Sequence, residues 1–86
     1  MLMETAVARP VISREDFIDE VNRRMRNHHA YQDGWRVFLY PEGAHPDAVQ
    51  GWSIEPRSAA GHIRRVSDHV FSNFAVEPPL RREPHD

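Results

Sequence analysis

The sequence has no cysteine and no lysine. Without cysteine, the chain cannot form a disulfide, a thiolate nucleophile or a cysteine-ligated zinc site, and its composition is compatible with a reducing compartment. All 11 basic residues are arginine. Arginine offers planar stacking and bidentate pairing that lysine does not, but a bias that runs through the whole chain does not indicate a site.

Long apolar runs are also missing from the sequence. No segment is long and apolar enough to cross a bilayer, so no contact with a membrane is expected. The first residues lack the basic start and apolar stretch of a secretory signal, so a cytoplasmic location is the default expectation. The formal net charge of −2 disfavours a protein that lives on nucleic-acid phosphates.

What the chain does have is the composition of an ordinary globular domain, with 40% hydrophobic and 28% charged residues among 86. We predict one packed domain over residues 11–76, a flexible N-terminal segment over 1–10 and a flexible tail rich in proline and charge over 77–86. A domain of this size buries only about 60% of its unfolded surface. Because disulfides are excluded, oligomerisation is the common remaining source of extra burial.

The first predicted helix begins after Ser13, which is a good N-cap with Asp16 in the capping-box position. Acidic residues fill the first half and arginines the second, which suits the helix macrodipole and allows i,i+4 ion pairs such as Asp19 with Arg23. The helix is expected to end between residues 27 and 31. Its apolar stripe consists of Phe17, Ile18, Val21 and Met25.

A hairpin follows, and it explains why a Gly-Trp pair occurs twice, at residues 34–35 and 51–52. Residues 35–40 and 49–55 are rich in β-forming side chains, and the intervening loop contains two prolines and a glycine. Alternation along the strands puts one set of side chains on the face toward the helices: Trp35, Val37, Leu39, Trp52 and Ile54. We predict a register with Trp35 opposite Ile54 and Val37 opposite Trp52, so that both indoles belong to the core.

A second helix is predicted after Pro56, with Ser58 as its cap and Pro78 preventing its continuation. Its apolar positions recur at helical spacing: Ile63, Val66, Val70 and Phe74. The expected fold is a small α+β domain of order α-β-β-α, in which two amphipathic helices pack on one face of an antiparallel hairpin. There is room for a short extra strand at Val11 or earlier.

The six histidines invite a metal hypothesis, but their spacing argues against it. His28 and His29 are neighbours, and His62 and His69 lie two helical turns apart, too far for one ion to join them. We expect structural or solvated histidines, with His28 half-buried and sensitive to pH.

Catalytic motifs are weak as well. Ser67, Asp68 and His69 are consecutive, so on a helix they point apart, and the sequence contains no GxSxG or HExxH motif and no phosphate-cradling glycine loop. The sequence therefore favours a non-enzymatic protein with no catalytic, cofactor or metal site.

Five arginines could form a basic patch if the two helices lie side by side. The interpretation we favour is two solvated helix faces whose charges have acidic partners nearby. The five are Arg23, Arg24, Arg26, Arg64 and Arg65.

The outer face of the predicted hairpin carries a second apolar surface. Exposed contiguous apolar patches mark contacts, and an unbroken apolar run such as residues 37–40 is typical of a strand covered on both faces. Its predicted members are Arg36, Phe38, Tyr40 and Val49, with Ser53 beside them.

Three covers for this face are consistent with the sequence. One is the N-terminal segment with Val7, Val11 and Ile12, and another is a second copy of the chain in a two-fold dimer. The third is single-stranded nucleic acid, with bases on the two aromatic rings and a phosphate on the arginine. We predict a protein-interaction module that forms a homodimer or binds another protein. The alternative is a nucleic-acid-binding module that uses the same face and the helix arginines.

Overall fold

The computed structural model describes residues 9–85. Val7 and most of the N-terminal segment predicted to be flexible lie outside the described residues, as does Asp86. Two short 3-10 turns, Pro46–Ala48 and Arg57–Ala59, join the main elements. In chain order these are β1 (Val11–Ile12), α1 (Arg14–Met25), β2 (Arg36–Tyr40), β3 (Gly51–Glu55), α2 (Ala60–Asn73) and β4 (Ala75–Val76).

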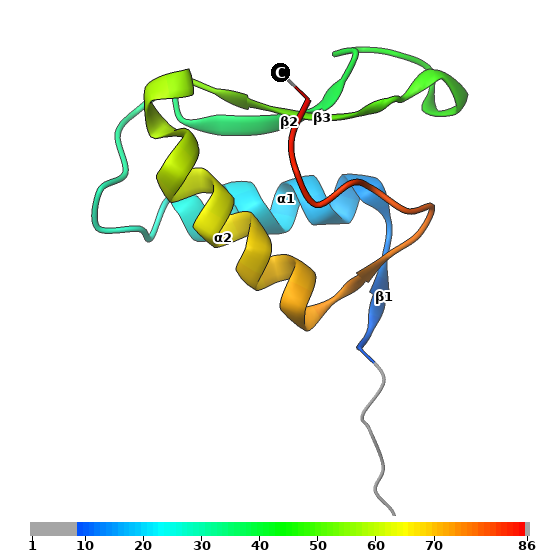
Figure 1. The fold of residues 1–86 in the computed structure, drawn as a ribbon, viewed down its shortest axis with the longest axis horizontal. Coiled ribbons are helices and arrows are strands. Elements are labelled where there is room, and N and C mark those ends of the chain that lie inside the picture. Colours follow the sequence, from blue (N-terminus) through cyan, green and yellow to red (C-terminus); the bar gives the residue numbers. More distant parts are fainter. Residues whose placement is uncertain (1–8, 86) are drawn as a thin grey trace, which may run out of the picture.

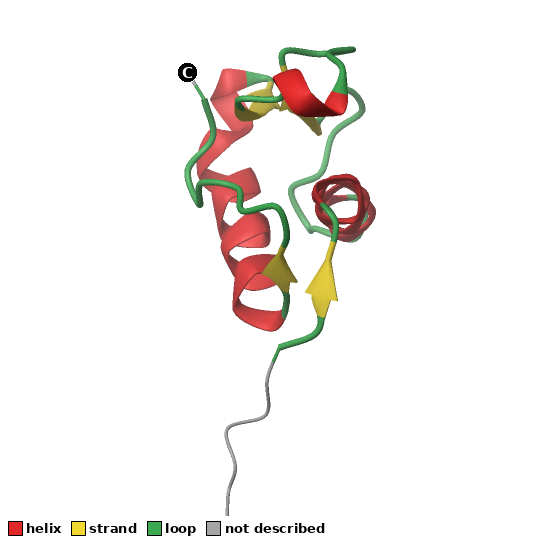
Figure 2. Ribbon diagram, turned by 90° about the vertical axis from the view of Figure 1, so that its right-hand side faces the viewer, coloured by secondary structure: helices red, strands yellow, loops and turns green. Residues whose placement is uncertain are grey.

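The chain forms a small mixed domain with two helices and a short antiparallel sheet, as predicted. In Figure 1 the β2–β3 hairpin lies along one side, and α1 and α2 cross beneath it. The two short strands β1 and β4 run side by side at the opposite end of the molecule, an arrangement that Figure 2 shows from a second direction. This second pair extends the predicted order at both ends, and only its first strand was anticipated from the sequence.

Helix α1 begins as its sequence dictates. The Ser13 hydroxyl accepts a hydrogen bond from the Asp16 amide at 3.0 Å, and the helix buries Phe17 and Val21 against the rest of the core. Its end comes earlier than expected, at Met25. There the hydrogen bonding tightens from i→i−4 to i→i−3 over residues 27 and 28, which closes the helix before the histidines.

The hairpin register differs from the predicted one by two residues. Val37 lies opposite Ile54 and Leu39 opposite Trp52, whereas we expected Val37 opposite Trp52. The 3-10 turn over 46–48 holds the Val49 amide in a bond to Pro46, so β3 begins only at Gly51. A shift of two residues keeps every side chain on its predicted face, because side chains alternate with a period of two.

The two tryptophans occupy different places. Trp52 is fully buried and meets the Phe17 ring edge-on at 5.4 Å between centroids. Trp35 is half-buried at the margin of the core, next to Tyr31 and His62. The core as a whole is formed by Phe17, Val21, Met25, Val37, Trp52, Ala59, Ile63, Val70, Phe71 and Val76.

Helix α2 starts without the cap that we predicted. Its N-cap residue is Ala59, and Ser58 makes no capping hydrogen bond, because the turn over 57–59 enters the helix directly. The buried side is centred on Ser67 and Phe71, and Val66 and Phe74 are only half-buried. The buried Ser67 hydroxyl has a hydrogen-bond partner, because it donates to the Arg64 carbonyl at 3.0 Å.

Candidate interaction surface

The outer face of the hairpin carries Arg36, Phe38 and Tyr40, and its arginine is fully engaged. Val49, which we also predicted on this face, precedes β3 as the C-cap of the 3-10 turn. The Arg36 guanidinium lies over the Phe38 ring, 4.3 Å from its centroid. It donates to both carboxylate oxygens of Glu42, at 2.8 and 3.1 Å, and to Glu55 at 2.9 Å. These hydrogen bonds hold the pKa of the Glu42 carboxyl below its usual range. The positive charge of Arg36 is therefore matched within the molecule.

The C-terminal residues reach this face and partly cover it. The His85 ring stacks on Tyr40 at 4.0 Å between centroids, and the Ser53 hydroxyl donates to the His85 carbonyl at 3.3 Å. The Trp52 indole donates to the Arg81 carbonyl at 2.7 Å, which holds the same stretch against β3. Figure 1 shows this segment, in red, rising from β4 to the hairpin.

Val11 and Ile12, the described residues of the N-terminal cover that we considered, do not lie on the outer face of the hairpin. Val11 and Ile12 form β1, which pairs with Ala75 and Val76 of β4 at the other end of the molecule, away from the hairpin (Figure 1). The pairing is parallel, so the start of the described chain is tied to the segment that follows α2 and not to the hairpin.

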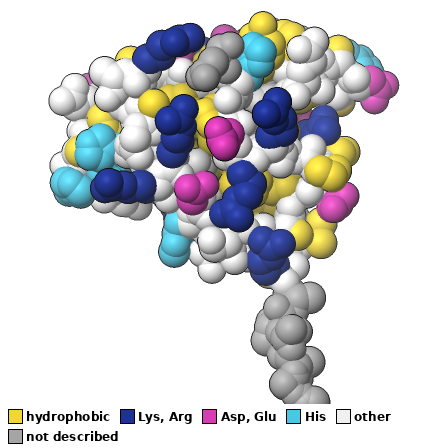
Figure 3. Space-filling view, in the orientation of Figure 1, with side chains coloured by type: hydrophobic (Ala, Val, Ile, Leu, Met, Phe, Trp, Pro, Cys, Tyr) yellow, Lys and Arg dark blue, Asp and Glu magenta, His cyan; other side chains and the backbone are white. Residues whose placement is uncertain are grey.

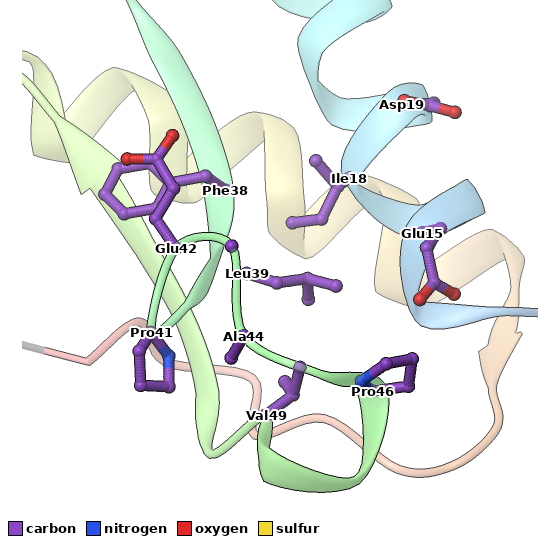
Figure 4. Close-up of a pocket in the computed structure, with 11 residues that line it drawn as sticks. Glu15, Ile18, Asp19, Phe38, Leu39, Pro41, Glu42, Ala44, Pro46 and Val49 are labelled. Atoms are coloured by element: carbon purple, nitrogen blue, oxygen red, sulfur yellow. The ribbon is translucent and has the colours of Figure 1, made fainter.

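Phe38 and Val49 also border a groove that the sequence did not indicate. The groove lies between α1 and the loop after β2, and it has a volume of about 260 Å³. Figure 4 shows its lining, in which Ile18 and Leu39 point toward each other across the floor. The residues that line it are Glu15, Ile18, Asp19, Phe38, Leu39, Pro41, Glu42, Gly43, Ala44, Pro46 and Val49.

The groove depends on how the loop folds, and local propensity does not determine this. The available signal was the apolar character of Ala44 and Pro46, in a segment that we treated only as a connection, and of Val49, which we assigned to the outer face of the hairpin.

The predicted basic patch is divided by acidic partners. Arg23 and Arg24 both bond to the Glu20 carboxylate, the latter at 3.1 Å, and these bonds lower the pKa of Glu20. Arg26, on the turn after α1, and Arg64 and Arg65, on α2, are exposed. On the face that Figure 3 shows, arginine and acidic side chains are interspersed.

Three histidines come together at one end of the domain, which helical spacing did not predict. The His28 ring lies 4.4 Å from His29 and 5.1 Å from His62 between centroids, and the Trp35 ring stacks on His62 at 5.7 Å. Helical spacing relates histidines within one helix. The contact between His28, just after α1, and His62, at the start of α2, joins two separate segments and does not follow from that spacing.

This histidine cluster has the features of packing and not of a metal centre. Within residues 9–85, no set of three or more imidazole or carboxylate groups is arranged to hold a metal ion. The Nδ1 atom of His28 accepts from the Ala30 amide at 3.0 Å, and Nδ1 of His62 is buried without a hydrogen-bond partner. Burial first, and then the neighbouring His29, His62 and Arg65, lower the pKa of His28.

Neither α1 nor α2, the helices of the described part of the chain, has the length and apolar character to cross a membrane. Comparison with protein-family models, with curated proteins and with solved structures finds no match for this chain.

Proposed function

We propose that the protein is a non-enzymatic interaction module that forms a homodimer through the outer face of its β2–β3 hairpin. The observation that carries the proposal is the one-sided arrangement of the sheet. The core fills one face, and the other presents Phe38 and Tyr40, both only half-buried. A two-stranded sheet with an aromatic outer face gains stability when a further layer covers it.

The charges around this face favour a second copy as that layer. Arg36 lies beside Phe38 and is flanked by Glu42 and Glu55. A two-fold axis through Phe38 would bring the arginine of each copy toward the acidic pair of the other, around an aromatic centre. Such a patch is complementary to itself.

A nucleic-acid-binding module on the same face is the alternative, and the pairing of its arginines speaks against it. Arg36 has two carboxylate partners, and Arg23 and Arg24 share Glu20. Phosphates would have to displace these acids.

We also place the protein in the cytoplasm as part of the proposal, because a chain without cysteine needs no oxidising compartment.

The test is the molar mass in solution, measured by light scattering at low and high salt. We expect a dimer for the native chain and a folded monomer for Phe38→Asp. The matched control Ser58→Asp adds the same charge to an exposed turn and should leave the dimer intact. Circular dichroism verifies that each variant is folded.

A native chain that is monomeric at every concentration and salt tested would refute self-association. Binding of single-stranded RNA that weakens steeply with salt would instead support the nucleic-acid alternative, because phosphate contacts release counterions.

A further inference from the structure

The groove between α1 and the loop after β2 has the size of a side-chain site. Its volume of about 260 Å³ lies below the roughly 300–1,000 Å³ of pockets that hold small molecules and cofactors. Ile18 and Leu39 form its floor, and Ala44, Pro46 and Val49 form the wall on the loop side (Figure 4). One or two apolar side chains would fill this space.

The charged residues of the groove all have the same sign. Glu15, Asp19 and Glu42 line it, and no arginine or histidine does. Glu42 is already bound to Arg36. Among residues 9–85, Glu15 and Asp19 have no ion-pair partner, and the pair that we predicted between Asp19 and Arg23 is not formed because Arg23 turns to Glu20 instead.

The edge of β2 that faces α1 offers hydrogen bonds at the same place. In an antiparallel pair, every second residue directs its amide and carbonyl away from the partner strand. Val37 is such a residue, and Asn22 meets both groups, with Nδ2 donating to the carbonyl at 3.1 Å and Oδ1 accepting from the amide at 2.9 Å.

Leu39 lies two residues further along β2, so its amide and carbonyl point the same way as those of Val37. Asn22 is committed to Val37, and no other group in the described chain bonds to this edge of Leu39. One donor and one acceptor are therefore free beside the groove.

We propose that this groove binds an extended segment of a partner protein in which an apolar side chain is flanked by arginine or lysine. The apolar side chain fills the space above Ile18 and Leu39, and the cations meet Glu15 and Asp19. The segment's backbone pairs with the amide and carbonyl of Leu39 as a short added strand. An acidic rim over an apolar floor selects for this combination, because a neutral segment leaves the acids unpaired and a purely polar one leaves the floor empty.

This inference goes beyond self-association because its occupant is a different molecule, although the groove shares Phe38 and Glu42 with the surface proposed for the dimer. The experiment starts from a displayed library of random nine-residue peptides, selected on the full chain. Peptides that also bind the variant Glu15→Arg/Asp19→Arg are removed. We expect the remaining peptides to share an apolar residue flanked by at least two arginines or lysines.

The strongest peptide is then synthesised with a fluorescent label, and its Kd is measured by anisotropy. Reversing both groove charges should weaken binding about tenfold or more, because two attractions become repulsions. The control Asp68→Arg reverses one exposed acid on α2 outside the groove and should leave the Kd within about twofold, since a single remote surface charge contributes little.

Because Glu15 lies in the first turn of α1, its replacement can weaken the helix itself. The second variant Ala44→Leu avoids this by filling the groove from the loop side, and it should also abolish binding. Hydrogen exchange followed by NMR gives the backbone readout. The Leu39 amide should exchange more slowly with the peptide bound, whereas the Val37 amide, already bonded to Asn22, should change little.

Four results would overturn the proposal: no enriched peptide, an acidic or uncharged consensus, equal weakening by Asp68→Arg, or an unprotected Leu39 amide in the complex. The molar mass of the free chain separates the two proposals. A monomer that binds the peptide contradicts self-association alone. Because the dimer face shares Phe38 with the groove, a dimeric chain contradicts the groove site only if it binds no peptide after dilution to the monomer.

Discussion

The contact between Asn22 and Val37 leads to a prediction that can be worked from the structure. Asn22 is half-buried on α1 and satisfies both backbone groups of Val37 at the edge of β2. Asn22→Ala removes the donor and the acceptor together, and α1 still lies against the strand. An unsatisfied buried group costs about 1–3 kcal/mol, so we expect a loss of about 2 kcal/mol for this partly buried pair.

For a domain of 60–100 residues, each kcal/mol corresponds to a change in Tm of roughly 4–8 °C. The variant should therefore melt about 8–16 °C lower than the native chain. Thermal unfolding by circular dichroism measures the shift, and urea unfolding checks it through the midpoint and the slope. If the m-value is unchanged, the loss belongs to the native contact and not to an altered unfolded state.

The control is Asn27→Ala, because Asn27 is exposed just beyond the same helix and its side chain makes no hydrogen bond within residues 9–85. It should stay within about 0.5 kcal/mol of the native chain. A second variant, Asn22→Asp, keeps an acceptor for the Val37 amide but replaces the donor to the Val37 carbonyl with a carboxylate oxygen, so that two acceptors face each other. It should be destabilised at neutral pH and recover partly in acid. Equal stability of Asn22→Ala and Asn27→Ala would refute the assignment.

Three further outcomes follow from the contacts described above. Trp52→Phe removes the indole donor to the Arg81 carbonyl, so we expect a loss of roughly 1–2 kcal/mol and faster tryptic cleavage after Arg81. The pKa of His28 lies below 6.5 in the folded state, so its stabilising contribution is present above pH 6.5 and is lost as the pH falls through the folded value. His28→Gln should flatten the decline of Tm between pH 7 and 5. The pKa of Glu42 is likewise lowered by Arg36, so its contribution is present above pH 4.5 and is lost as the pH falls through the folded value. Glu42→Gln should reduce the dependence of Tm on pH below 4.5.

Each of these variants has a matched control. Trp35→Phe makes the same change at an indole that holds no C-terminal residue, and tail cleavage should stay slow; equal acceleration would contradict the role of Trp52. His45→Gln tests an exposed histidine, and a pH profile that His28→Gln and His45→Gln change alike would remove His28 as the cause. Glu83→Gln removes an exposed acid without an ion pair in the described chain, so it should leave the dependence of Tm on pH below 4.5 unchanged.

Short-range physics predicted those parts of the fold that depend on neighbouring residues. The Ser13 cap, the polarity of α1 and the burial of Trp52 and Val37 all follow from spacing of four residues or fewer. The period of two kept the faces of the hairpin correct even where the register was wrong, because the shift was an even number of residues.

The remainder depends on contacts between distant segments, which local patterns do not specify. His62 meets His28 only because α2 starts where α1 has ended, and Ala75 becomes a strand only because Val11 is beside it. The groove exists because the loop over residues 41–49 folds back toward Ile18. In each case the partner lies too far along the chain for periodicity to identify it.

The parallel pairing of β1 with β4 also bears on how the protein is made. Val11 is synthesised well before its partner Ala75, and Trp52 before its partner Arg81. While residues 60–85 are still inside the ribosome, these partners are absent, and helix α1 has only the hairpin to pack against. We expect folding to finish only after residue 85 has left the ribosome, with slow closure because the contacts that complete the fold join residues far apart in the sequence. A C-terminal extension that tethers the chain to the ribosome should therefore hold the nascent protein in a protease-sensitive state until the linker is long enough to free residue 85.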